Sequence, residues 1–115
     1  MLPKINRIKK KKDFETVFKN SKSFKNNLFV FKITKNNLKL SRFGFVVSQK
    51  VSKKATIRNK VKRRLAEIIG DEIKNIKIGT DLVLIALPGI EKKEFSEIKE
   101  VINGTLLKAK LIIKE

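Results

Sequence analysis

The sequence has 115 residues, of which 41% are hydrophobic, and a chain of this length and composition predicts a single domain with a modest core. It contains neither Cys nor His, which excludes disulfides, thiolate or imidazole metal sites, and catalysis by either side chain. The formal net charge of +18 favours a polyanionic partner, because that much self-repulsion is costly in a small domain.

Nucleic acid is the partner that this charge predicts. An acidic membrane surface is the alternative, but Phe and Ile are spread along the chain rather than lining one peripheral amphipathic helix. The first residues, "MLPKINRIKKKKDF", are basic but lack an apolar segment of the signal-peptide type, and no run approaches 18 apolar residues. We therefore expect a cytoplasmic protein.

The N-terminal part predicts a basic arm followed by a short helix. The lysine run at residues 9–12 predicts a mobile arm over residues 1–12 that contacts phosphates. Asp13 is a candidate cap for a helix in which Phe14, Val17 and Phe18 recur at i, i+3 and i+4, and the polar "NSKS" ends it. Taken alone, a Phe pair at this spacing indicates core packing.

Two apolar stretches, "LFVFKIT" (28–34) and "RFGFVVSQ" (42–49), predict strands. Between them "LKLS" (38–41) predicts a middle strand, which makes an antiparallel meander. Side chains alternate between the two faces of a strand. The predicted inward face carries Phe29, Phe31 and Ile33, and the predicted opposite face carries Lys32, Val46, Ser48 and Lys50.

The second half predicts helix, strand and helix. "KKATIRNKVKRRLAEIIG" (53–70) is a basic helix that Gly70 ends, and "TDLVLIALPG" (80–89) reads as a strand buried on both faces. The last segment has two interpretations. Asn103-Gly104 is a strong hairpin signal, whereas a stripe at helical spacing with Ser96 as a candidate cap favours a helix, which we prefer. The stripe consists of Phe95, Ile98, Ile102, Leu106 and Ala109. The predicted element order is α-β-β-β-α-β-α.

On a helical wheel the basic helix separates into a core stripe and a polar arc. The stripe contains Ile57, Val61, Leu65 and Ile68. The adjoining arc contains Arg58, Asn59, Lys62, Arg63 and Ala66. Three cations and one amide on one arc suit contact with phosphates and a base edge or 2′-hydroxyl. The alternative is an ordinary solvated face, but Arg is concentrated here, and Arg suits bidentate phosphate contact.

The segment "ATIRNKVKRRLAE" resembles the R-N-x-x-K-R signature of the protein component of bacterial ribonuclease P. "RIKKKKDFETVFKNSKSF" and "SRFGFVVSQKVSKKA" resemble the same family's opening and its strand before the signature helix. The resemblance covers nearly the whole chain in the expected order.

This resemblance implies an α/β (α+β) two-layer sandwich like ribosomal protein S5 domain 2, with a left-handed βαβ crossover. It implies the non-catalytic protein subunit of an endoribonuclease whose catalytic centre lies in an RNA subunit. That enzyme removes the 5′ leader of precursor tRNA, with magnesium bound mainly by the RNA subunit and substrate. No obligate protein partner is implied.

The family's functional residues map onto two surfaces. Arg58, Asn59, Lys62 and Arg63 would bind the catalytic RNA. Phe14 and Phe18, here expected to be partly exposed, would line the leader-binding cleft with Lys50 and Lys54, and strand parity adds Lys32, Val46 and Ser48. Three residues depart from the family pattern, namely Ala66 and Leu87 at commonly basic positions and Lys32 at a sometimes aromatic one.

Two other classes share the small, basic, Cys-free composition. One is a ribosomal protein that binds only structured rRNA, and the other is a nonspecific DNA-compacting protein. The R-N-x-x-K-R helix and the aromatic N-terminal helix argue against both.

Overall fold

The computed structural model describes residues 2–112 and confirms the α-β-β-β-α-β-α order. The helices are α1 (Lys11–Lys19), α2 (Ala55–Glu72) and α3 (Phe95–Lys108). The strands are β1 (Lys22–Lys25), β2 (Phe29–Lys35), β3 (Arg42–Val46) and β4 (Thr80–Ala86). Short 3-10 turns form at Lys4–Asn6, Ile73–Asn75 and Ile90–Lys92. Within residues 2–112, no helix combines the length and apolar content that crossing a bilayer requires.

The four strands form one mixed sheet in the order β1-β2-β4-β3. β2 is antiparallel to both β1 and β4, whereas β3 is parallel to β4. The predicted antiparallel meander is therefore wrong, because β4 lies between β2 and β3. The β3–α2–β4 segment is a crossover between parallel neighbours, as the family resemblance implies, and its left-handed sense stays a prediction.

Two of the three predicted N-terminal strands are placed correctly, and the third is not. β2 and β3 occupy the predicted apolar stretches, although β3 ends at Val46 rather than at residue 49. Residues 38–40 form a bend, and the remaining strand is β1, which overlaps the polar "NSKS" that the sequence predicts only as the end of the first helix. β1 has only one apolar residue, Phe24, which pairs with Phe31 and packs against the core.

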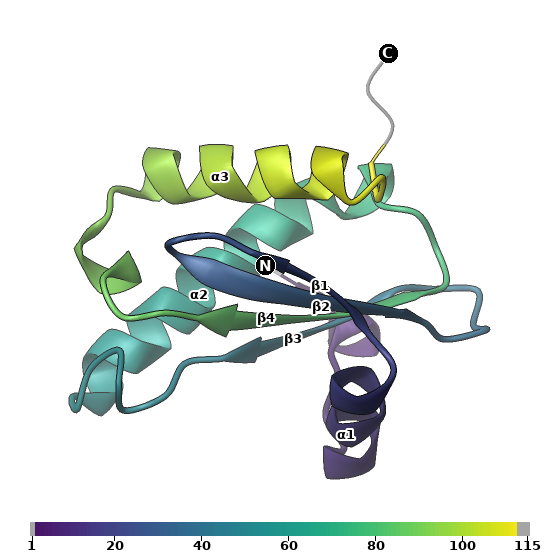
Figure 1. The fold of residues 1–115 in the computed structure, drawn as a ribbon, viewed down its shortest axis with the longest axis horizontal. Helices are drawn as coiled ribbons and strands as arrows, with labels where there is room; N and C mark the ends of the chain where they lie inside the picture. The colour runs from purple at the N-terminus through teal and green to yellow at the C-terminus, as the bar shows by residue number, and fades with distance from the viewer. Residues whose placement is uncertain (1, 113–115) are drawn as a thin grey trace.

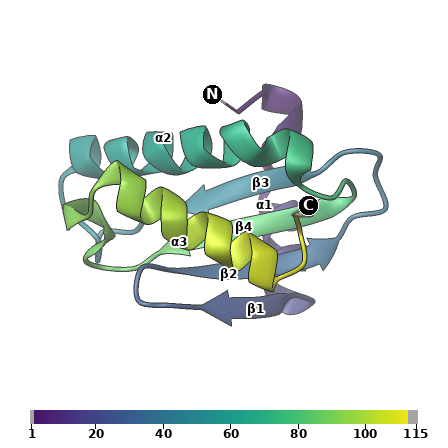
Figure 2. The ribbon, with the colours of Figure 1, turned by 90° about the horizontal axis from the view of Figure 1, so that it is seen from above.

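The sheet has helices on both faces (Figures 1 and 2). α2 and α3 cover one face and bury the larger core, which includes Phe29, Phe31, Leu65 and Ile102. α1 lies against the other face, where Val17, Ile8 and Val83 form a smaller buried cluster. β4 is buried on both faces because it lies between these layers. The predicted two-layer sandwich is present, with α1 added on the opposite face.

Helix ends differ from the predicted ones, while the predicted apolar stripes hold. α1 begins at Lys11, so Asp13 lies inside its first turn rather than at its cap. α2 continues through Gly70 to Glu72, and α3 begins at Phe95, one residue before Ser96. α3 runs through Gly104, where a Cβ would meet nothing within 4 Å. An exposed Gly costs a helix only about 1 kcal/mol, which the buried stripe of α3 outweighs.

The N-terminal segment packs against the sheet in place of the predicted mobile arm. Leu2 and Ile8 are buried, and the Ile8 amide donates to the Phe43 carbonyl (2.9 Å). Lys11 and Lys12 begin α1. Only the exposure of the lysine side chains agrees with the expectation of a basic arm.

A buried carboxylate joins the elements at one end of the sheet. Asp81 of β4 is 4% exposed and accepts hydrogen bonds from Arg42 Nε (3.0 Å) and Nη2 (2.6 Å). Asn36 donates to the same carboxylate (2.8 Å), and Arg42 Nη1 reaches Asp13 of α1 at 3.2 Å. The hydrogen bonds to Asp81 raise the pKa of Arg42 above its usual value, so the guanidinium stays charged.

This network predicts unequal costs for removing its two acids. Asp81→Asn is expected to lower the free energy of unfolding by about 2 to 4 kcal/mol, because it leaves Arg42 without its main buried partner. Asp13→Asn removes a more exposed ion pair and is expected to cost less than about 1 kcal/mol. Urea unfolding of both variants measures the difference, and equal costs would show that the Asp81 pair does not organise this end of the sheet.

Candidate RNA-binding surfaces

The polar arc of α2 is exposed beside a buried stripe, as the helical wheel predicts. Val61, Leu65 and Ile68 are buried in the core, and Ile57 is half-buried. The arc residues Asn59, Lys62 and Arg63 are exposed, and Arg58 is half-buried. The core stripe therefore fixes which side chains α2 presents to solvent.

The cations of this arc have different local roles. Arg58 Nη1 donates to the Ser52 and Lys53 carbonyls (3.0 and 2.9 Å), which ties the helix to the connection that precedes it. Arg64, one position beyond Arg63, turns to the other side and donates to the Lys93 carbonyl (3.4 Å). Within residues 2–112, no carboxylate forms an ion pair with Arg58, Lys62 or Arg63. These charges are thus available to an external anion.

The aromatic pair of α1 lies partly exposed on the opposite side of the sheet. Val17 anchors α1 in the smaller cluster, and Phe14 packs against that cluster. The Phe18 ring is 43% exposed, and its centroid is 6.5 Å from that of Phe14. The expectation of partly exposed rings is confirmed, because only Val17 of the stripe is fully buried.

Gly44 of β3 allows α1 to approach the sheet closely. A Cβ at this position would lie 2.5 Å from Phe14 Cε1 and 2.8 Å from Cζ, distances that real Cβ contacts essentially never show. The Phe14 ring therefore rests on the β3 backbone where any other residue would displace it. This contact sets the position of the aromatic pair relative to the strand.

The remaining residues predicted for the leader-binding cleft divide into two groups. Lys32 and Val46 share the α1 face of the sheet, because Lys32 pairs with Val83 and Val46 with Ile85. The Lys32 ammonium donates to Ser23 Oγ (3.0 Å). Ser48, Lys50 and Lys54 are exposed in the connection between β3 and α2, so strand parity does not govern them. The inward prediction for Phe29, Phe31 and Ile33 is confirmed.

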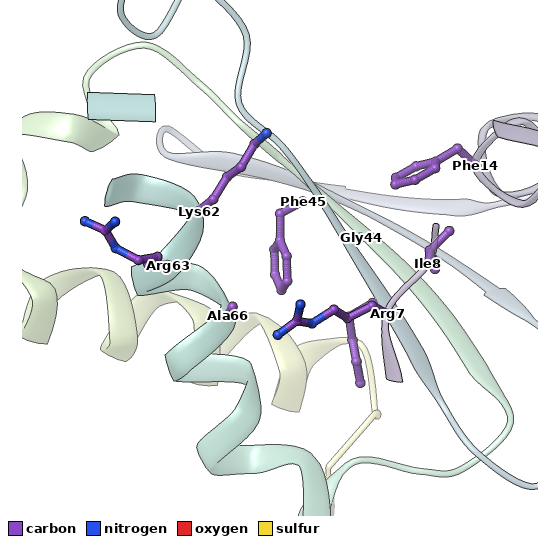
Figure 3. A pocket seen from close by; sticks show the side chains of 9 residues that line it. Arg7, Ile8, Phe14, Gly44, Phe45, Lys62, Arg63 and Ala66 are labelled. Atoms are coloured by element: carbon purple, nitrogen blue, oxygen red, sulfur yellow. The ribbon is translucent and has the colours of Figure 1, made fainter. Parts of the chain in front are cut away.

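A pocket of about 260 Å³ lies at the edge of β3 between α2 and the N-terminal segment (Figure 3). Lys62, Arg63 and Ala66 line it from α2. Phe14, Phe45 and Arg7 line it from other elements. Sequence reasoning missed Arg7 and Phe45, because only the bridge between Arg7 and Phe43 brings the N-terminal segment to this edge.

Together, the fold and the unpaired basic arc define a small α/β protein suited to contact with a polyanion. The sequence model of the Ribonuclease P family matches residues 2–110. The ribonuclease P protein component of Clostridium botulinum is 38% identical over 107 residues, covering 92% of this chain and 96% of that protein. That of Synechocystis is 44% identical over 88 residues, covering 76% and 71%.

Solved structures agree with the sequence matches. The RNase P protein from Thermotoga maritima superposes with a TM-score of 0.81 at 33% identity, covering 95% of this chain and 98% of that one. The Staphylococcus aureus RNase P protein gives a TM-score of 0.86 at 29% identity, covering 94% and 98%. The chain therefore belongs to the ribonuclease P protein family, whose members take part in tRNA processing.

Proposed function

We propose that this protein is the RNA-binding subunit of ribonuclease P and that it contacts two RNAs through two surfaces. The α2 arc binds the catalytic RNA, and the α1 face binds the single-stranded 5′ leader of precursor tRNA during its endonucleolytic removal. The observation that carries the proposal is the polar arc of half-buried Arg58 with exposed Asn59, Lys62 and Arg63. This arc matches the family signature, and its cations have no carboxylate partner within the described residues.

The distribution of charge supports this assignment. Residues 1–64 contain 21 of the 29 basic residues and only 2 of the 11 acidic ones. They include α1, the first three strands and the first half of α2, whereas α3 lies in the nearly neutral remainder. A polyanion would therefore be attracted to the α1 face and the start of α2, and not to α3.

The order of charged residues along α2 also supports this assignment. Helices are stabilised by acidic residues near the N-terminus and basic residues near the C-terminus. α2 has the reverse arrangement, with Lys53, Lys54 and Arg58 at its start and Asp71 and Glu72 at its end. This arrangement weakens the isolated helix, but it concentrates positive potential where phosphates would bind.

The chemistry of the α1 face suits a single strand of variable sequence. Binding of this kind uses aromatic faces for stacking and cations that follow the backbone. Phe14 and Phe18 supply the rings, and Lys32 supplies a cation on the same side of the sheet. Lys50 and Lys54 extend the basic track into the connection before α2.

The cleavage chemistry is assigned to the RNA subunit. Magnesium is proposed to be bound mainly by that RNA and the substrate, as the family resemblance implies. The protein contributes positioning and charge neutralisation, and its proposed location is the cytoplasm.

Reconstitution tests the proposal directly. Adding the protein to a bacterial ribonuclease P RNA at low magnesium is expected to stimulate 5′ cleavage of precursor tRNA, because the basic surfaces replace part of the cation requirement. Cleavage products resolved on a gel measure this. A folded protein that gives no stimulation would contradict the proposal and favour a ribosomal or nonspecific nucleic-acid-binding role.

Neighbouring arginines on α2 provide a matched test of the catalytic-RNA surface. Arg63→Ala is expected to weaken assembly with the catalytic RNA by about 1 to 3 kcal/mol without changing the melting temperature. Arg64→Ala removes the same charge on the other side of the helix and is expected to weaken assembly less. Filter binding at one salt concentration measures both. Equal losses would indicate that only net charge matters.

Arg58→Ala is expected to combine two effects. It removes a phosphate contact and also the hydrogen bonds to the Ser52 and Lys53 carbonyls, which are together worth about 1 kcal/mol of stability. Thermal unfolding and RNA affinity measured in parallel separate these losses. An unchanged melting temperature would show that the Arg58 side chain is not needed to hold the connection.

Replacing both Phe14 and Phe18 with Leu separates leader recognition from general RNA affinity. The change keeps much of the apolar volume but removes the aromatic faces, costing about 1 to 3 kcal/mol per unstacked base. The holoenzyme should bind precursor tRNA more weakly while its affinity for mature tRNA is retained. Equal weakening for both substrates would mean that the pair only supports the fold.

A further inference from the structure

The pocket at the edge of β3 combines three aromatic residues, Phe14, Phe43 and Phe45, with three cations, Arg7, Lys62 and Arg63. The Phe45 ring extends between α2 and Arg7, with Ala66 beside it (Figure 3). Lys62 and Arg63 line the pocket from the preceding turn of α2. No acidic residue is among those that line it.

The walls of this pocket have the two chemical parts of a nucleotide site. Phe45 is half-buried and packs with its inner side against the main core, which holds the ring in place. Ala66, whose side chain ends at Cβ, lines the pocket beside the ring. Arg7 Nε donates to the Leu2 carbonyl (3.0 Å), which fixes the guanidinium group at the rim. An anchored ring surrounded by cations suits a stacked base with its phosphates.

The size of the pocket limits what can enter. Pockets for drug-sized ligands occupy roughly 300 to 1,000 Å³, and this one is about 260 Å³. It therefore suits a single planar base rather than a paired segment, whose bases are already stacked in a helix. An unpaired, turned-out nucleotide fits both the size and the charge.

We propose that one unpaired nucleotide of the catalytic RNA inserts into this pocket, with its base on Phe45 and its phosphates near Arg7, Lys62 and Arg63. This inference rests on the proposed function. Phe14 of the leader surface also lines the pocket, so the pocket borders both surfaces. The catalytic RNA is favoured because Lys62 and Arg63 belong to the α2 arc and the proposed stacking ring, Phe45, lies on the α2 face of the sheet. Phe45 pairs with Leu84 of the main core, whereas the leader surface lies on the α1 face.

The sequence provides a clean spectroscopic test, because the chain has no Trp and no Tyr. Phe45→Trp introduces a single indole whose emission a stacked base is expected to quench. Phe24→Trp is the matched control. Phe24, Phe31, Leu84 and Phe45 form one row across the same face of the sheet, so Phe24 occupies the opposite edge. Both rings are half-buried and pack against the same core.

Titration with the catalytic RNA alone should quench the indole emission of the Phe45→Trp variant and leave that of the Phe24→Trp control unchanged. Binding by the Phe45→Trp variant with unchanged emission would overturn the proposal while the proposed function stands. No binding by the unmodified protein would instead contradict the proposed function. The second arm of the experiment is a titration with a single-stranded leader oligonucleotide. If the oligonucleotide quenches the emission of the Phe45→Trp variant and the catalytic RNA does not, the pocket belongs to the leader and the proposal is overturned.

A second pair of variants keeps the test decisive if the larger indole perturbs folding. Phe45→Leu retains apolar volume without the aromatic face and is expected to weaken binding of the catalytic RNA roughly tenfold. Phe24→Leu is expected to leave that affinity unchanged. Both affinities are compared at one ionic strength, since phosphate contacts vary with salt. Equal affinity for Phe45→Leu and the unmodified protein would overturn the proposal.

Discussion

The pairing of Arg42 with Asp81 is the interaction on which the arrangement of both surfaces depends. The two residues are register partners in the parallel β3–β4 pair, and Arg42 also reaches Asp13 in the first turn of α1. Asp81 is 4% exposed, and a carboxylate buried to that degree is costly unless its charge is paired. The network therefore specifies where β3 lies beside β4 and where α1 begins, and both candidate surfaces use β3 or its flanks.

The basic surfaces carry a physical cost that binding would remove. The start of α2 places cations where the helix dipole is unfavourable, and the described ion pairs engage only Arg42 and Lys93 among the basic side chains. A domain optimised for stability alone would intersperse acids along this face. Instead most of the acids lie in the second half of the chain, so the cations of the first half repel one another in the free protein. Phosphates bound between these cations would relieve that repulsion.

Local patterns predicted most elements of this fold, and nonlocal pairing accounts for what they missed. The stripe of α2 determines its exposed arc, and the buried stripe of α3 overrides the Asn103-Gly104 turn signal. β1 has one apolar residue and forms because β2 offers it an edge, which no local pattern reveals. Likewise β4 inserts between β2 and β3, although the whole of α2 separates it from β3 along the chain. The Phe45 pocket forms because a bridge between Arg7 and Phe43 brings the N-terminal segment to β3. No local sequence pattern links Arg7 and Phe45 to the pocket residues of α2.

The two surfaces differ in the kind of recognition that their side chains allow. On the α1 face, the partly exposed groups include aromatic rings, aliphatic side chains and Lys32, which can contact any base or phosphate and distinguish few sequences. The α2 face adds the Asn59 amide, which can read a base edge, and the enclosed ring of Phe45. The proposed binding of one constant RNA and many different leaders would use this division. Gly44 of β3 lies beneath Phe14, and Phe45 of the same strand lines the pocket that Phe14 also borders, so one strand supports both surfaces where they adjoin.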